Sequence, residues 1–163
     1  MTALTASKQR PVKPPQYGLA TFAVPLIGYT NKGSGNTAHT VYKGSIVTID
    51  VSDSDGYARA LADETVATGD VFAGIAAEKQ IVDSDITGDG DADLTVYRNG
   101  VWGFAKGQLS VADVGANAYA SDDDSITTTD TNNLWVGKIV GVDSTYVWVD
   151  IAPAWMREQD DAP

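Results

Sequence analysis

The chain of 163 residues has no cysteine, a single histidine and no long apolar run. The lack of cysteine excludes disulfides and thiolate chemistry, and it leaves the cellular compartment open. No segment approaches the length of a membrane span, and the opening MTALTASKQRPVKPP contains no apolar signal-peptide core. We therefore expect a soluble protein that is made in a cytoplasm and has no membrane partner.

The same scarcity argues against catalysis. A Ser/His/Asp site would have to use His39, and no serine stands in a nucleophile-elbow pattern. A carboxylate pair would need at least one buried acid with a shifted pKa. Asp50 and Asp150 each interrupt a strand pattern, but both occupy the polar side of their alternation. The sequence predicts that the protein is not an enzyme.

Acidic residues are abundant, and they are unevenly distributed. The first fifteen residues contain Lys8, Arg10 and Lys13 and no acid. The rest of the chain holds all 22 acidic residues and eight of the 11 basic ones, so it carries a net charge of −14. Because phosphate binding requires a basic face, we expect no nucleic-acid partner.

The strand and turn signals predict an all-β fold. Residues 134 to 151, LWVGKIVGVDSTYVWVDI, have the pattern of a hairpin that turns at Asp143-Ser144. Asn99-Gly100 predicts a second hairpin within residues 94–106. Pro25 makes the apolar run 19–29 either an edge strand or two short strands with a break. We expect a small β-barrel or a jelly-roll-like sandwich with an extended N-terminal arm.

The chain divides into three parts. Residues 1–17 are expected to form the arm, because its prolines disfavour helix and central strand. The arm is either a disordered terminus or a segment that becomes ordered on a neighbouring subunit. Residues 18–152 form a single β domain. Residues 153–163 form an acidic tail, in which Trp155 is expected to cover a groove on its own body or on a partner.

The acidic stretch DSDITGDGDAD, residues 83–93, matches the front half of an EF-hand-like calcium loop. Val96 stands where the bidentate glutamate should be, and no helices flank the loop. A solvated acidic turn is therefore favoured over a weak Ca²⁺ site. The candidate ligands are Asp85, Thr87, Asp89, Asp91 and Asp93.

Three segments carry a family resemblance: VADVG (111–115), AYASDDDSITTT (118–129) and VWVDI (147–151). In this order, and after KGSIVTIDVSDSDGYARAL (43–61), they resemble the capsid cement or decoration proteins of tailed bacteriophages. The resemblance covers about residues 1 to 151 and identifies no catalytic residue and no cofactor. It does not extend to the calcium-like loop or to the tail.

The resemblance implies a structural protein on the outer surface of a phage head. It implies assembly with itself, a homotrimer being favoured over a homodimer, and an arm that bridges neighbouring major capsid proteins. The expected capsid contacts in the arm are Lys8, Arg10, Pro11, Lys13, Pro14 and Pro15. The expected oligomer or partner contacts are Trp135, Trp148 and Trp155. The alternative is a non-enzymatic β-sandwich module that binds a carbohydrate or a receptor through Trp102, Trp135 or Trp155.

Overall fold

The computed structural model describes residues 4–13, 18–29, 38–51, 56–63, 66–67 and 69–151. These residues form an all-β structure of antiparallel sheets with two 3-10 turns, η1 (Leu61–Asp63) and η2 (Val111–Asp113). No helix in this part of the chain is long and apolar enough to cross a membrane. The strands are β1 (Val12–Lys13), β2 (Thr21–Pro25), β3 (His39–Val41), β4 (Ile46–Ile49), β5 (Ala58–Ala60), β6 (Val71–Ala76), β7 (Gln80–Val82), β8 (Asp93–Tyr97), β9 (Val101–Ala105), β10 (Asn117–Ala120), β11 (Ile126–Thr127), β12 (Leu134–Val142) and β13 (Tyr146–Ile151).

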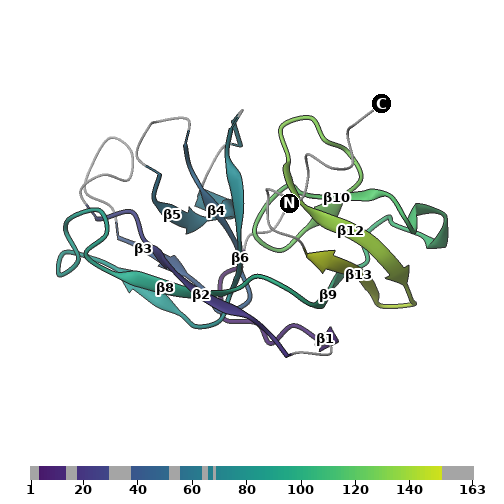
Figure 1. Ribbon diagram of the computed structural model, residues 1–163, viewed down its shortest axis with the longest axis horizontal. Coiled ribbons are helices and arrows are strands. Elements are labelled where there is room, and N and C mark those ends of the chain that lie inside the picture. The colour runs from purple at the N-terminus through teal and green to yellow at the C-terminus, as the bar shows by residue number, and fades with distance from the viewer. Residues whose placement is uncertain are drawn as a thin grey trace.

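The strands belong to three sheets. A six-stranded sheet has the order β1-β9-β13-β12-β10-β11, and a five-stranded sheet has the order β2-β8-β6-β4-β5. Strands β3 and β7 form a small third sheet. Figure 1 shows the six-stranded sheet on one side of the molecule and the other two sheets on the opposite side. The expected sandwich is confirmed, whereas the structure is not a closed barrel.

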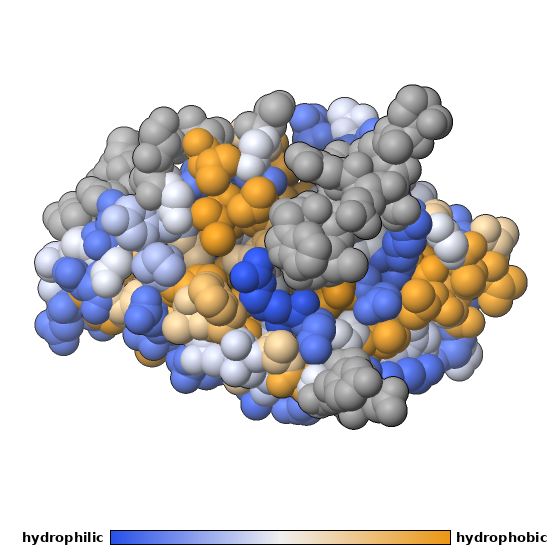
Figure 2. Space-filling view, viewed as in Figure 1, coloured by the Kyte–Doolittle hydropathy of each residue, from blue (hydrophilic) through white to orange (hydrophobic). Residues whose placement is uncertain are grey.

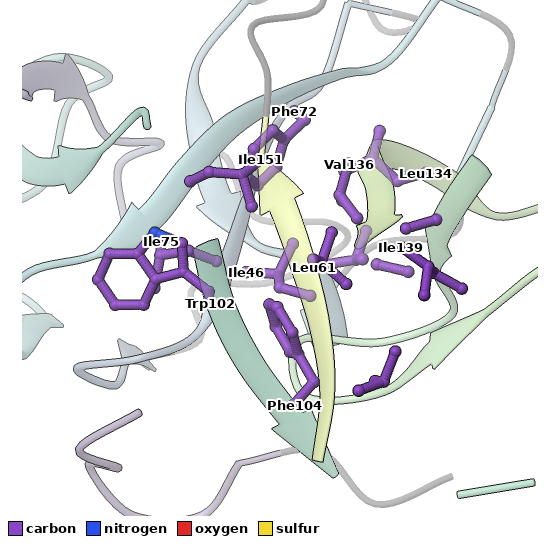
Figure 3. Packing of buried hydrophobic residues seen from close by; sticks show 14 of the residues in the cluster. Ile46, Leu61, Phe72, Ile75, Trp102, Phe104, Leu134, Val136, Ile139 and Ile151 are labelled. Carbon is purple, nitrogen blue, oxygen red and sulfur yellow. The ribbon is translucent and has the colours of Figure 1, made fainter. Parts of the chain in front are cut away.

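Strands β4, β5 and β6 of the five-stranded sheet are buried on both faces and are therefore almost continuously apolar, whereas β2 is mostly exposed. In β6, Phe72 and Ile75 join the cluster shared with the six-stranded sheet, and Ala73 and Ala76 join the cluster shared with β3 and β7. Figure 3 shows the first cluster, where Phe72, Ile75 and residues of β4 meet the side chains of β9, β12 and β13.

A bulge explains why Phe72 and Ile75 share a face although they are three residues apart. The register of β4 against β6 passes from Val47 opposite Gly74 to Thr48 opposite Phe72, so one residue of β6 is extra. Such an extra residue reverses the alternation of side chains. Gly74 has φ +147°, and a Cβ there would strike the Tyr97 carbonyl and the Val96 side chain. Glycine is therefore required at this point.

The hairpin predicted at Asn99-Gly100 is wrong, because β8 and β9 belong to different sheets. The closing hairpin has the predicted form. Along β13, Val147, Val149 and Ile151 are buried, and the residues between them are half-buried or exposed. The register of β12 shifts near Gly137 on one side and near Gly141 on the other, where the glycines predicted a bulge. The residues before and at Pro25 form β2 at the end of the five-stranded sheet, which confirms the predicted edge strand.

Candidate functional site

The N-terminal segment, residues 4–13, lies against the β domain of its own chain. The Lys8 N–H donates to the Lys43 carbonyl (2.8 Å), and the Gly103 N–H donates to the Pro11 carbonyl (2.8 Å). The segment then forms β1, which pairs antiparallel with β9. It thereby adds a strand to the edge of the six-stranded sheet, which is the geometry of strand addition.

Arg10 anchors this segment, and it is only 2% exposed. Its Nε donates to the Gly44 carbonyl (2.5 Å) and its Nη2 to the Asp123 carbonyl (3.0 Å). Nη2 also lies 2.8 Å from Asp124 Oδ1. The guanidinium carbon stands 4.3 Å from the centre of the Phe104 ring, within range of a cation–π interaction. An arginine stays charged in a protein, so this burial requires the partners that surround it.

The segment binds to the acidic turn between β10 and β11, which runs from Ser121 to Ser125. Asp122 holds the turn itself, because its Oδ1 accepts the N–H groups of Asp124 (2.8 Å) and Ser125 (2.9 Å). Asp124 faces outward and binds the charged heads of both Lys8 (3.0 Å) and Arg10. The three consecutive acids therefore have separate roles, since Asp123 points inward.

Asp123 is 1% exposed and accepts two hydrogen bonds from distant parts of the chain. Its Oδ1 accepts the Leu4 N–H (2.9 Å), and its Oδ2 accepts the Ser45 hydroxyl (2.8 Å). Burial raises the pKa of the Asp123 carboxyl, and these two hydrogen bonds oppose the rise. Burial also lowers the pKa of Arg10, against the attraction of Asp124. The site thus holds charge in a poorly solvated position, and its stability depends on pH.

Two glycines let the segment approach the domain closely. A Cβ at Gly103 would stand 2.6 Å from Pro11 Cγ, and a Cβ at Gly44 would strike the Lys8 carbonyl. Any larger residue at Gly103 would therefore push the segment away from β9. The two glycines therefore allow the backbone of the segment to lie directly on the domain.

The far end of the segment covers an aromatic side chain. Lys13 Nζ stands 4.3 Å from the centre of the Trp148 ring, and Trp148 Nε1 donates to Asp143 Oδ2 (2.7 Å). The Tyr146 and Thr145 N–H groups also donate to the Asp143 carboxylate, and together these bonds lower the pKa of Asp143. Asp143 therefore fixes both the turn of the closing hairpin and the orientation of Trp148.

The residues predicted to contact a capsid are thus placed on the chain's own domain where the structure describes them. Lys8 remains partly exposed, whereas Arg10 faces inward. Pro11 lies on Gly103, and Lys13 lies on Trp148. Pro14 and Pro15 fall outside the described residues. Contact of this segment with a capsid stays a prediction.

The tryptophans differ from their predicted role as an exposed stacking surface. Trp102 is 4% exposed and Trp135 is 7% exposed, so neither ring is free to stack on a flat ligand. The sequence reasoning took them as surface residues, but each belongs to a strand whose neighbours cover it. Trp148 is half-buried beneath Lys13, and Trp155 lies outside the described residues.

The carboxylates of the acidic loop between β7 and β8 accept backbone N–H groups from the loop itself and from the chain after β2. The Asp89 carboxylate accepts the Gly28 N–H (2.7 Å), and the Asp91 carboxylate accepts the Gly88 N–H (2.7 Å). Among the described residues, no three acidic, histidine or cysteine side chains are grouped so that they could hold a metal ion. The structure therefore does not bring together the ligands predicted from the sequence, which are Asp85, Thr87, Asp89, Asp91 and Asp93.

Asp50 is also placed differently from its predicted position on the polar side of a strand. It is fully buried, and its carboxylate accepts a hydrogen bond from Arg59 of the neighbouring strand β5. The hairpin between β4 and β5 brings the cation beside the acid, and a buried charge is tolerated when it is paired. Asp150 is exposed, as its alternation predicted.

Exposed apolar side chains gather at one end of the molecule. Val111 is 74% exposed, and Val114 and Val140 are each 47% exposed. Backbone hydrogen bonds join Gly115 and Ala116, which follow η2, to Ile139 of β12 and so bring these valines near one another. Figure 2 shows an apolar surface at this end of the molecule.

Sequence reasoning missed that the N-terminal segment is held by the acidic turn. The sequence does contain a basic segment without acids and a run of three aspartates. Opposite charges in a sequence, however, do not show which of several acidic turns binds the basic segment. No protein-family model, no curated protein and no solved structure matches this chain.

Proposed function

We propose that this chain is a structural capsid decoration protein that binds the outer surface of a phage head and bridges neighbouring major capsid proteins. One observation carries the proposal. Two of the three segments that resemble the decoration proteins, the β10–β11 hairpin and β13, belong to one sheet, and the turn after η2 is hydrogen-bonded to β12 of that sheet. Segments that combine into one structural unit support a resemblance more strongly than scattered matches.

The N-terminal segment supports the same proposal. It is bound by the SDDDS turn, which lies within one of the three segments that carry the resemblance. The segment is held on the domain by side-chain contacts and one short strand pairing. It therefore forms a defined part of the surface with which the domain can contact a capsid. Many modest contacts of this kind, repeated over a shell, add up through multivalency.

The direct test mixes the purified full-length protein with undecorated, expanded phage heads and measures bound protein against free protein. We expect saturable binding at a fixed ratio to the major capsid protein and greater resistance of the heads to heat. Arg10→Ala is expected to weaken this stabilisation more than Val111→Ser, because only the first releases the segment. Absence of saturable binding to heads would overturn the proposal.

A surface pocket gives the alternative, a carbohydrate-binding module, one specific point of support. The pocket has a volume of about 250 Å³, and most of the surface that lines it is polar. A glycan array probed with the labelled protein tests this alternative, and Asn132→Ala should abolish any signal that arises from the pocket. Its lining consists of Val66, Ala67, Gly69, Asp70, Asp130, Asn132, Asn133, Leu134 and Trp135.

A further inference from the structure

A smaller pocket lies where the N-terminal segment meets the domain. Its volume is about 70 Å³, whereas roughly 15 Å³ of such volume holds one water molecule. The exposed Gln9 and the buried Arg10 both line the pocket, so it reaches from the surface to the guanidinium. Residues of the domain, among them Gly44 and Trp102, line the other side. The pocket therefore has room for a small ligand, and it exists only because the segment lies on the domain.

One nitrogen of the Arg10 side chain has no acceptor. Nε donates to the Gly44 carbonyl, and Nη2 binds the Asp123 carbonyl and the Asp124 carboxylate. Nη1 is buried, and no group in the described part of the chain accepts a hydrogen bond from it. A buried donor without an acceptor is destabilising. Because Arg10 lines the pocket, an acceptor bound there can take the hydrogen bond of Nη1.

The charged side chains that line the pocket are all basic. Lys8 and Lys43 join Arg10 in the lining, and among the described residues no acid does. The Lys8 ammonium already binds Asp124 (3.0 Å), whereas Lys43 forms no ion pair within the described residues. In a chain of net charge −11, this pocket is therefore a local site for an anion.

The remaining lining narrows the kind of anion. Val12, Leu19 and Trp102 give the pocket apolar walls. Phosphate is polar on every side, so it would lose its hydration against these walls without compensation. A carboxylate carries its charge at one end of an apolar stem. Its two oxygens can accept from a guanidinium and an ammonium group at the same time.

We propose that this pocket binds a carboxylate, which accepts a hydrogen bond from Arg10 Nη1 and pairs with Lys43. The same chemistry is offered by a small free carboxylic acid and by a glutamate side chain on a protein surface. Because the segment and the domain both line the pocket, the ligand binds only while the segment is docked. It therefore stabilises the docked segment by mass action.

The test titrates the isotope-labelled full-length protein with propionate at constant ionic strength. The signals of the Arg10 Nε–H and of the Gly44 amide, followed by NMR, are expected to shift saturably. Propionamide has nearly the same size and no charge, and it should cause no shift. Lys43→Gln should raise the propionate Kd about tenfold or more, because a charge-assisted hydrogen bond is lost.

The matched control is Lys79→Gln. It removes the same charge from an exposed side chain that lies over the ring of Tyr42, the neighbour of Lys43, and does not line the pocket. The propionate Kd should stay unchanged in this variant. If both lysine variants weaken binding equally, the effect is one of overall charge, and the pocket is not the site.

A second titration distinguishes the two sources of the carboxylate. It compares a short peptide with blocked ends and one central glutamate with its glutamine counterpart. Binding of the glutamate peptide shows that the pocket accepts a protein side chain, and binding of propionate alone restricts it to free carboxylates. Failure of both probes to bind would overturn the proposal, as would equal shifts with propionamide. No phage heads are used, so this failure is distinct from that of the decoration proposal.

Discussion

The two large sheets differ in how their edges are covered. At the β9 edge of the six-stranded sheet, the N-terminal segment adds β1 and is anchored by Arg10, which is 2% exposed. At the β2 edge of the five-stranded sheet, Phe22 is 54% exposed, and Leu26, the residue after β2, forms a parallel bridge with Ala58 of β5. The chain thus covers one edge with a separate strand that buried side chains anchor, and it meets the other edge only at its end, with a strand of the same sheet.

The largest effect that tests this difference should come from Arg10→Ala. The variant removes the guanidinium that pairs with the Asp124 carboxylate and donates to the carbonyls of Gly44 and Asp123, which we expect to cost about 3 kcal/mol of unfolding free energy. Urea unfolding followed by tryptophan fluorescence measures the change. Lys8→Ala is the matched control, because Lys8 pairs with the same acid from a more exposed position and should cost less than about 1 kcal/mol. Equal effects of the two variants would show that the segment is not anchored by burial.

A smaller effect is expected from Gly103→Ala, which places a methyl group against Pro11 and forces β1 away from β9. Overpacking of this kind costs about 1–3 kcal/mol. The control is Gly141→Ala, where the new methyl group would stand 3.7 Å from the Trp148 ring, an ordinary contact. Chemical denaturation should show a clear loss for the first variant and little change for the second. The reverse order would contradict the docking of the segment on Gly103.

A direct comparison of the two edges uses proline on each. The Gly103 N–H donates to the Pro11 carbonyl, and in an antiparallel ladder every second residue bonds to the same neighbour, so Lys13 also bonds to β9. Lys13→Pro should remove the hydrogen bond of the Lys13 N–H at a cost of about 1 kcal/mol. Lys13→Ala separates the loss of the side-chain contact with Trp148. Ala23→Pro should change the unfolding free energy by less than about 0.5 kcal/mol. The Ala20 carbonyl and the Leu26 N–H bond to the chain of β8 and its ends, so the N–H of Ala23, which has the opposite phase, points away from β8. A larger loss for Ala23→Pro than for Lys13→Pro would mean that the β2 edge is covered.

The smallest effect is a difference in pH dependence between the wild-type protein and Asp123→Asn. Because the pKa of Asp123 is raised in the folded state, the folded chain binds more protons than the unfolded chain. Stability linked to this group is therefore fully present below the ordinary aspartate pKa of about 3.9 and is lost as the pH rises through the raised value. Asp123→Asn lacks this loss, so it should gain stability relative to the wild-type protein as the pH rises. Thermal unfolding at a series of pH values measures the difference, and parallel curves would contradict it.

Local patterns predicted several parts of the fold. The alternation along residues 146–151 gave the buried and exposed faces of β13, because side-chain direction in a strand depends only on neighbours in the sequence. Pro25 marked an edge strand because proline cannot donate to a ladder. Gly137 marked a register shift, since its φ of +152° is costly for other residues.

The candidate site was less predictable. The sequence marked Lys8, Arg10 and Lys13 as a basic segment, but it could not show that Arg10 would be buried rather than extended toward a partner. Asp50 likewise carried the pattern of an exposed residue, and only the adjacent Arg59 allows it to be buried. In both cases the partner decides the environment of the charge, and the partner is supplied by another strand.

The sequence by itself therefore determined an all-β protein with an acidic domain, a basic N-terminal segment, a closing hairpin and an edge strand at Pro25. Only the tertiary structure decided that the segment closes one sheet edge and that the chain after β2 is bridged to β5. Arg10 and the carbonyl that it binds at Asp123 are 113 residues apart. Contacts at such separations depend on how the sheets assemble, and no local propensity or spacing specifies them.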